Sequence, residues 1–348
     1  MFLDRLRARL LKANSYPTLC GLILISFSVP AVSQAPRGNC GHPDPDISIA
    51  GCTKKIQSDS ADLKAGRGLL QAAAAHLATD YDNRGVAYAN KGLYDQAIED
   101  FNQAISLLPK SFPAAYFNRG SAYGNQGLDD QAIADFTMAI SLEPGGAGPD
   151  FKLADAYDYR GNAYERKGLY DEAIADFTVA ISLNPRLEGA YANRGNDYLR
   201  KGQYDLAIAD FGMVISFDPR NVASRFNRAL AYQHKGLYDD AIADFTKVIS
   251  LASADAGAYD ARGLAYAHNG LYDQAIADYT KEIALNAKDI QRYPVFARQY
   301  ANAYVHRADA YGHKGLTDAA VADYREALKL DPVMQPAKDA LARLGAVP

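Results

Sequence analysis

The stretch YDNRGVAYANKGLYDQAIEDFNQAI, residues 81–105, predicts two amphipathic helices joined by a tight turn. After the turn, Ile98 and Phe101 begin an apolar stripe with the spacing of one helix face. Gly92 suits the left-handed C-terminal cap of the first helix. Asp95 is placed to cap the second helix through its carboxylate. One such hairpin cannot bury its stripe alone, so we expect neighbouring hairpins to stack on it.

The stretch returns along the chain. Its central alanine recurs at intervals of 35, 41, 34, 34, 34 and 45 residues, at Ala97, Ala132, Ala173, Ala207, Ala241, Ala275 and Ala320. A period near 34 residues with two helices per unit is typical of the tetratricopeptide repeat. The chain resembles this family over residues 78–334, with the family's packing positions occupied by Tyr88, Gly92, Ala97, Phe101, Ala104 and Pro109. The resemblance implies an all-α fold, a right-handed superhelical solenoid of antiparallel helix pairs with a concave and a convex face.

The period divides the chain into an array of seven copies with additions at both ends. The copies are expected at 78–112, 113–144, 154–187, 188–221, 222–255, 256–288 and 301–334. Two insertions, 145–151 and 289–300, are predicted to be surface loops or helix extensions. Residues 335–348 are predicted to form a C-terminal capping helix and tail. In the N-terminal cap, 34–77, IAGCTKKIQ matches IADFTKVIS of the fifth copy, which indicates a degenerate half repeat.

Residues 1–33 have the three-part pattern of a secretory signal peptide. A basic segment, MFLDRLRARLLK, precedes the apolar TLCGLILISFSV and the small residues of PAVSQA. The apolar run is shorter than the roughly 20 residues that span a membrane. We expect cleavage after Ser33, with cleavage after Ala35 and an uncleaved anchor as alternatives. The interpretation predicts a periplasmic or secreted protein of the bacterial envelope, with no membrane span after cleavage.

Cys40 and Cys52 are the two cysteines that remain after cleavage. An even number of cysteines in an oxidising compartment favours a disulfide. A metal site built from Cys40, His42 and Cys52 is the alternative, but it lacks a fourth ligand at a recognisable spacing. In the half-repeat register Cys52 occupies an inward-facing position, so the bond would fasten the preceding segment over the end of the array.

An arginine and an aspartate recur in every copy. The arginines are Arg84, Arg119, Arg160, Arg194, Arg228, Arg262 and Arg307, and the aspartates are Asp100, Asp135, Asp176, Asp210, Asp244, Asp278 and Asp323. If the helices are folded back at Gly92, Arg84 lies close to Asp100. We predict a structural ion pair in each copy, formed within a copy or between neighbours.

The residue before that arginine is the candidate for function. It is an asparagine in four copies, at Asn83, Asn118, Asn193 and Asn227, and it is replaced by Tyr159, Ala261 and His306 in the others. The position resembles the asparagine ladder of the repeats in glycosyltransferases that add N-acetylglucosamine to proteins. This resemblance implies amides on the concave face that bind the backbone of an extended peptide. The alternative is a surface asparagine that binds only water.

Other side chains indicate how the predicted concave face could bind a ligand. Phe117 and Phe226, one position earlier, are candidate apolar pockets for a ligand. No lysine occupies that position, which disfavours the family's carboxylate-clamp mode of binding. His234, His268 and His313 share one position but stand one repeat apart, so we interpret them as surface residues and not as metal ligands.

Composition and motifs favour a binding protein. The formal net charge of −4 disfavours nucleic acid as a partner. The chain has no nucleophile elbow, phosphate loop or His/Glu metal motif, so we expect no catalytic residues, metal or cofactor. We predict a non-catalytic scaffold that binds a peptide or protein segment in its groove. An envelope assembly subunit and an accessory subunit of an enzyme complex remain as alternatives.

Overall fold

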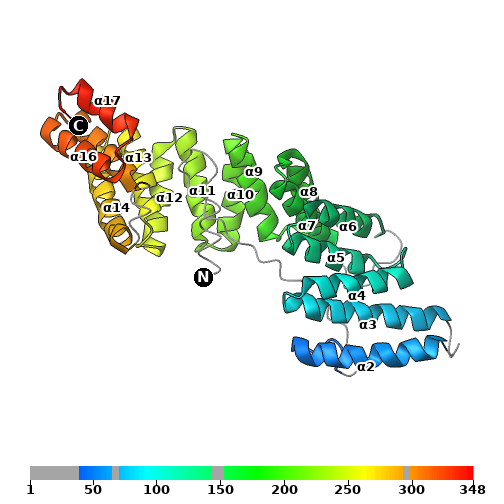
Figure 1. Cartoon of the computed structure of the whole chain (residues 1–348). Helices are drawn as coiled ribbons and strands as arrows, with labels where there is room; N and C mark the ends of the chain where they lie inside the picture. The colour runs from blue at the N-terminus through cyan, green and yellow to red at the C-terminus, as the bar shows by residue number, and fades with distance from the viewer. Residues whose placement is uncertain (1–38, 65–69, 143–152, 293–297, 299, 348) are drawn as a thin grey trace. The chain divides into compact units, whose positions relative to one another are not determined.

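The structure, a computed structural model, describes residues 39–347 except 65–69, 143–152, 293–297 and 299 (Figure 1). These residues form helices and turns with no strand. The first helices of the seven copies are α3 (Leu70–Asn90), α5 (Pro113–Asn125), α7 (Leu153–Arg166), α9 (Glu188–Arg200), α11 (Val222–His234), α13 (Ala256–His268) and α15 (Ala301–His313). The second helices are α4 (Tyr94–Leu107), α6 (Asp129–Leu142), α8 (Tyr170–Leu183), α10 (Tyr204–Phe217), α12 (Tyr238–Leu251), α14 (Tyr272–Arg292) and α16 (Thr317–Leu330).

The helices belong to two compact units that divide between Leu251 and Ala252. Within each unit the two helices of a copy pack against each other, and successive copies stack in chain order. The first helix of a copy also contacts the first helix of the next, as α7 contacts both α5 and α9. The first helices of a unit therefore share one face, which is the face that the repeat pattern predicts to be concave.

The turn between the two helices has the geometry that Gly92 predicts. Seven glycines have φ between +70° and +76°, Gly92, Gly127, Gly168, Gly202, Gly236, Gly270 and Gly315. In the first copy the Gly92 N–H donates to Ala89 O (2.9 Å) and the Leu93 N–H donates to Tyr88 O (3.0 Å). These two bonds satisfy the last carbonyls of α3 and turn the chain directly into α4.

The prediction that Asp95 caps the second helix is wrong. Helix α4 begins at Tyr94 with Leu93 at the N-cap position, so the Asp95 carboxylate already lies in the first turn. It remains near the positive end of the helix dipole, and it accepts a hydrogen bond from Gln126 of the next copy at 2.8 Å. In later copies a lysine of the following copy takes this role, in the pairs Lys167–Asp130, Lys201–Asp171, Lys235–Asp205 and Lys314–Asp273.

A glycine lets the two helices of a copy approach closely. A Cβ added at Gly195 on α9 would lie 2.9 Å from Cε1 of Phe211, which is buried on α10. Gly85, Gly120, Gly161 and Gly263 face an aromatic ring in the same way. The fifth and seventh copies have Ala229 and Ala308 at this position, so their helices accommodate one methyl group.

Enlarging Gly195 should destabilise the protein. We expect Gly195→Val to lower the free energy of unfolding by about 1–3 kcal/mol, because the side chain must displace the Phe211 ring. Gly189, also on α9, has no atom within 4 Å of an added Cβ. Gly189→Ala should therefore be neutral or stabilise by about 0.5–1 kcal/mol through helix propensity. Urea unfolding of both variants tests the difference, and equal destabilisation would contradict the close approach.

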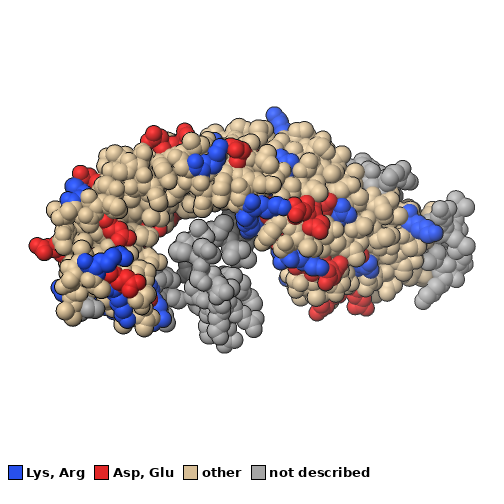
Figure 2. Space-filling model, turned by 90° about the horizontal axis from the view of Figure 1, so that it is seen from above, with Lys and Arg blue, Asp and Glu red and all other residues tan. Residues whose placement is uncertain are grey.

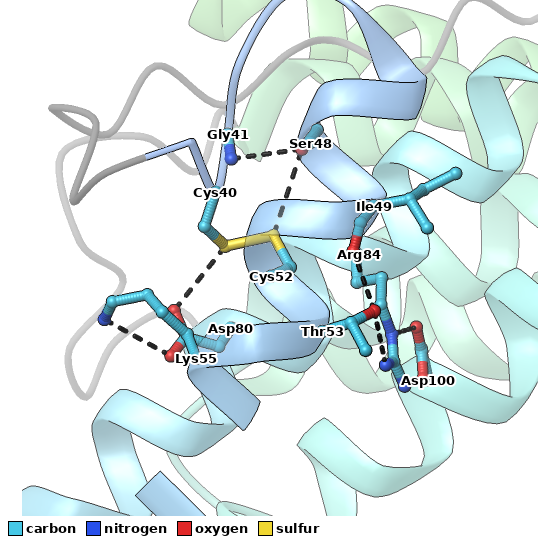
Figure 3. The surroundings of a disulfide bond; sticks show 10 residues. All are labelled: Cys40, Gly41, Ser48, Ile49, Cys52, Thr53, Lys55, Asp80, Arg84 and Asp100. Carbon is cyan, nitrogen blue, oxygen red and sulfur yellow. Dashed lines mark hydrogen bonds and ion pairs between the residues drawn. A yellow bond between two sulfur atoms is a disulfide. The ribbon is translucent and has the colours of Figure 1, made fainter. Parts of the chain in front are cut away.

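A disulfide-bonded helix precedes the first copy. Helix α2 (Pro45–Lys64) packs against α3, and Cys52 on α2 is bonded to Cys40 (Figure 3). Both cysteines are buried. The backbone of Asn39 lies against Gly51, where an added Cβ would come within 2.5 Å of the Asn39 carbonyl carbon. The predicted disulfide is confirmed, and the segment that it fastens lies on one face of α2.

Loss of the disulfide should loosen this N-terminal cap. The loop that it closes gives an expected loss of about 3 kcal/mol by the chain-entropy model. Thermal unfolding with and without a thiol reductant measures the effect, and Cys40→Ser/Cys52→Ser should show the same loss without responding to the reductant. A wild-type melting temperature that does not change with the reductant would contradict this account.

The remaining predicted segments are described in part. Helix α17 (Gln335–Arg343) packs against α16 through Leu341, which is fully buried, as expected of a capping helix. Helix α14 has 21 residues, against 14 for α12, so the second insertion begins as a helix extension. The predicted signal peptide, 1–33, and the first insertion, 145–151, lie outside the described residues.

Candidate functional site

Each repeated arginine lies against the repeated aspartate of its own copy. Arg84 Nε and Nη2 donate to the two carboxylate oxygens of Asp100, each at 2.7 Å. The same two-bond pair recurs at 2.7–2.9 Å in every other copy, in Arg119–Asp135, Arg160–Asp176, Arg194–Asp210, Arg228–Asp244, Arg262–Asp278 and Arg307–Asp323. The aspartates are buried and the arginines are largely covered, so the pairs are part of the interior.

Most of these arginines also bind the helix that precedes their copy. The Nη1 of Arg194 donates to Thr178 Oγ1 on the preceding second helix at 2.9 Å. Its guanidinium carbon lies 5.7 Å from each of two ring centroids, those of Tyr191 and Tyr198. Burial is the largest single effect and lowers the pKa of Arg194, but the hydrogen bonds to Asp210 and the charge of Asp210 together raise it above its usual value, so the group stays charged. The same bond to the preceding helix is made by Arg84, Arg119, Arg160 and Arg307, so these five arginines join both helices of their own copy to the helix before it.

Removal of the aspartate from a buried arginine–aspartate pair should leave the arginine's charge without a counter-charge. We expect Asp210→Ala to lower the free energy of unfolding by about 3–5 kcal/mol. The control is Lys201→Ala, which removes the pair with Asp171 at the surface, where the Asp171 side chain is 82% exposed. That variant should change stability by less than about 1 kcal/mol. Chemical denaturation of both variants measures the contrast, and a surface-like effect for Asp210→Ala would be inconsistent with a buried pair.

Two of the predicted ligand-binding asparagines are buried between copies. Asn118 on α5 is fully buried, and its Nδ2 donates to Asp82 Oδ1 on α3 at 2.9 Å. Asn193 on α9 is 6% exposed, and its Nδ2 donates to Asn162 Oδ1 on α7 at 2.7 Å. These two amides do not face a groove. The expectation of free amides fails here because adjacent first helices come close enough to enclose this position.

The other positions of this row remain partly accessible. Asn83 and Asn227 are half-buried. Asn227 Nδ2 donates to Asn196 Oδ1 at 2.8 Å, and Asn196 on α9 is also half-buried. Sequence reasoning missed Asn196, although it lies three residues after Asn193 and therefore on the same side of the helix. Asn162 likewise lies three residues after Tyr159.

Four asparagines therefore follow one another across three first helices. We call Asn162, Asn193, Asn196 and Asn227 the amide track, with members on α7, α9 and α11. Asn162 Nδ2 also donates to Asp158 Oδ2 at 3.3 Å. Among the described residues, the Asn196 Nδ2 donates no hydrogen bond and the Asn227 Oδ1 accepts none, so the half-buried end of the track keeps one donor group and one acceptor for a ligand.

The predicted aromatic pockets are filled by the protein itself. Phe117 is buried, and its ring lies 5.1 Å from Tyr159 and 5.6 Å from Phe136. Phe226 is half-buried, with its ring 5.3 Å from Phe245. Burial raises the pKa of Tyr159 to about 12, so its hydroxyl keeps its proton at neutral pH. Phe117 therefore belongs to the core, while Tyr159 and Phe226 retain some exposed surface.

A separate group of titratable side chains lies in the unit that begins at Ala252. His306 on α15 is hydrogen-bonded to Asp260 on α13 at 2.8 Å. Burial lowers the pKa of His306, but the Asp260 hydrogen bond and charge raise it above the usual value. Glu282 on α14 replaces the small residue of the other copies, and burial raises its pKa to about 9. A carboxyl with this pKa keeps its proton at neutral pH.

The histidines of the last three copies lie at the turn edge of the array. His234 stacks on Tyr204 of the preceding copy, with centroids 5.1 Å apart, and His313 stacks on Tyr272 at 4.8 Å. In the described part of the chain, no group of three or more His, Cys, Asp or Glu side chains is arranged to hold a metal ion.

Among the same residues, no helix combines the length and hydropathy needed to cross a bilayer.

The surface of the array has charges of both signs. On the face shown in Figure 2, Lys and Arg side chains alternate with Asp and Glu in small mixed groups, with wide areas of other residues between them. No large basic area appears on that face, in keeping with the acidic net charge of −4.

Models of the tetratricopeptide repeat match most of the array. They cover residues 83–111, 113–145, 154–187, 193–258, 235–290 and 301–333. The chain belongs to the tetratricopeptide repeat family. Proteins of this family are generally non-catalytic and bind protein or peptide partners. No protein with a curated description is significantly similar to this tetratricopeptide repeat chain.

Solved structures of bacterial tetratricopeptide repeat proteins have the same fold. The C-terminal part of such a protein from Cytophaga hutchinsonii aligns with a TM-score of 0.63 at 23% identity, over 74% of this chain and 98% of that one. A second, from Parabacteroides merdae, gives 0.50 at 21% identity over 76% and 97%. YrrB, described as having an unusual peptide-binding site, gives 0.50 at 22% identity over 55% and 94%. At these identities the likeness shows the fold alone.

Proposed function

We propose that this protein is a non-catalytic scaffold that binds a polypeptide segment on the first-helix face of the unit ending at Leu251. The observation that supports the proposal is the half-buried end of the amide track, Asn196 and Asn227. An amide offers both a donor and an acceptor, so it pairs with the N–H and C=O of any peptide unit. Binding through such groups depends little on the side chains of the segment.

The neighbouring residues fit this use of the face. Tyr159 and Phe226 present partly exposed rings on α7 and α11, which would pack against side chains of the segment. Asn83 extends the row to α3 with a half-buried amide. The arginines of this region are held in ion pairs within the protein. Arg166 pairs with Asp129, and Arg200 pairs with Glu165 and Asp197.

We further propose that the protein works outside the cytoplasm. The proposal rests on the pattern of residues 1–33 and on the bonded pair Cys40–Cys52, since structural disulfides persist in oxidising compartments. The partner is then an exported or envelope protein. Cell fractionation with thiol trapping of the native protein tests this, and a cytoplasmic protein with free thiols would contradict it.

A photo-crosslinking amino acid introduced at position 227 should capture the partner in cells. The same residue at Gln103, which is exposed on the second helix α4, is the matched control and should capture little. Mass spectrometry of the crosslinked peptides gives the identity of the segment. Crosslinks from position 103 with none from position 227 would place the binding surface elsewhere.

Affinity for the captured segment should then depend on the exposed amides. We expect Asn196→Ala/Asn227→Ala to weaken binding by roughly tenfold, since each lost hydrogen bond contributes about 0.5–1.5 kcal/mol. Gln103→Ala should leave the affinity unchanged. Calorimetric titration measures both, and an unaltered dissociation constant for the double variant would exclude the amide track as the contact.

A further inference from the structure

The first two copies meet at a buried acid–amide contact. Asp82 on α3 is 4% exposed and Asn118 on α5 is fully buried. Asn118 Nδ2 donates to Asp82 Oδ1 at 2.9 Å. The amide oxygen of Asn118, which is also buried, has no hydrogen-bond donor. A buried acceptor without a donor is costly, so such groups are rare in folded proteins.

In the described part of the chain, no cation forms an ion pair with Asp82. On the helices that pack around it, Lys55 of α2 pairs with Asp80, and Asp100 of α4 pairs with Arg84. On α5 the single cation is Arg119, which binds Asp135. Among the described residues, Asn118 is the one polar group that hydrogen-bonds to the Asp82 carboxyl. An ionised carboxylate there would be buried with a single hydrogen bond from a neutral amide, which is strongly unfavourable.

A single proton on Asp82 would give hydrogen-bond partners to both the Asp82 carboxyl and the Asn118 amide. A carboxylic acid has an O–H donor as well as an acceptor oxygen. With Asp82 protonated, its acceptor oxygen receives the Asn118 N–H and its O–H is available to the Asn118 amide oxygen. We propose that Asp82 and Asn118 form a proton-binding site that closes the joint between the first and second copies, and that loss of this proton loosens the joint.

The direction of the expected pH dependence follows from burial. Burial raises the pKa of Asp82 to about 7, and the Asn118 hydrogen bond lowers it by a smaller amount. An aspartate in the unfolded chain has a pKa of about 3.9. Between these values the native state binds more protons than the unfolded state, so stability falls as pH rises. The contribution is complete below about pH 4 and is lost above about pH 7.

Asp82 is a simpler site than the other buried aspartates. Asp158 and Asp197 each have a buried carboxylate oxygen without a hydrogen-bond partner, and burial raises the pKa of each to about 7. Charged neighbours act on both, Asp155 and Glu165 on Asp158, and Glu165, Arg200 and Lys201 on Asp197. Only Asp82 has a neutral amide as its single polar contact among these three, so its titration reports on one pair.

The proton can be observed directly in the wild-type protein. We expect the side-chain carbonyl carbon of Asp82, assigned by comparison with the Asp82→Asn spectrum, to titrate with a midpoint near pH 7. That midpoint corresponds to proton binding roughly 1000-fold tighter than in an unfolded chain. A midpoint near 4 would overturn the proposal, because the buried pair would then hold a carboxylate at neutral pH.

An amide in place of the acid should reproduce the protonated state at every pH. Asp82→Asn supplies an N–H to Asn118 and keeps the acceptor oxygen, without a titratable group. We expect its melting temperature to equal that of wild type below about pH 4 and to exceed it by a growing margin as the pH rises to 8. The control Glu99→Gln removes an exposed carboxylate from α4 and should follow the wild-type pH profile.

Two results would contradict the proposal. One is an Asp82→Asn protein that melts below wild type at pH 8, which would mean that the joint requires the charged form. The other is a Glu99→Gln profile that changes as much as that of Asp82→Asn, which would assign the effect to general surface charge. Neither result bears on ligand binding by Asn196 and Asn227, so the test is independent of the proposed function.

Discussion

The buried pair between arginine and aspartate is the constraint on which the array depends. The guanidinium of Arg194 uses two N–H groups on Asp210 and a third on Thr178 of the preceding copy. Because the fork is planar and the carboxylate oxygens are fixed, these bonds set the distance and the angle between three helices at once. The apolar stripe supplies the driving force for stacking, and the arginine selects one geometry from the many that an apolar surface permits.

The joint between the fourth and fifth copies shows how the array compensates for a lost contact. Gly212 stands where the neighbouring copies have threonine, so Arg228 has no hydroxyl to bind there. A second arginine, Arg225, replaces the usual tyrosine, and its Nη1 donates to Asp244 at 3.0 Å. Two cations of the fifth copy thus share one buried carboxylate, and the Nη2 of Arg225 donates to Pro219 O of the fourth copy at 3.1 Å.

The fold could be predicted from the sequence because its determinants are periodic. Tyr88, Gly92 and Phe101 return in register, and each has a local physical role that a single copy reveals. The helix start was predicted less well, because one residue separates a capping aspartate from one in the first turn, as at Asp95. The candidate site was the least predictable part. Whether Asn118 faces solvent or a neighbouring helix depends on how closely copies approach, and the period of the sequence does not contain that distance.

Helix α2 bears on whether two molecules of this protein can stack end to end. It takes the place of a second helix, since Thr53 accepts from Arg84 as Thr178 accepts from Arg194. On its other side the array would present an open stacking surface, to which the repeats of another molecule are complementary. The disulfide-bonded backbone at Asn39 and Cys40 lies against Gly51 on α2. The segment held by the disulfide thus covers part of the α2 surface that a further helix hairpin would need for stacking.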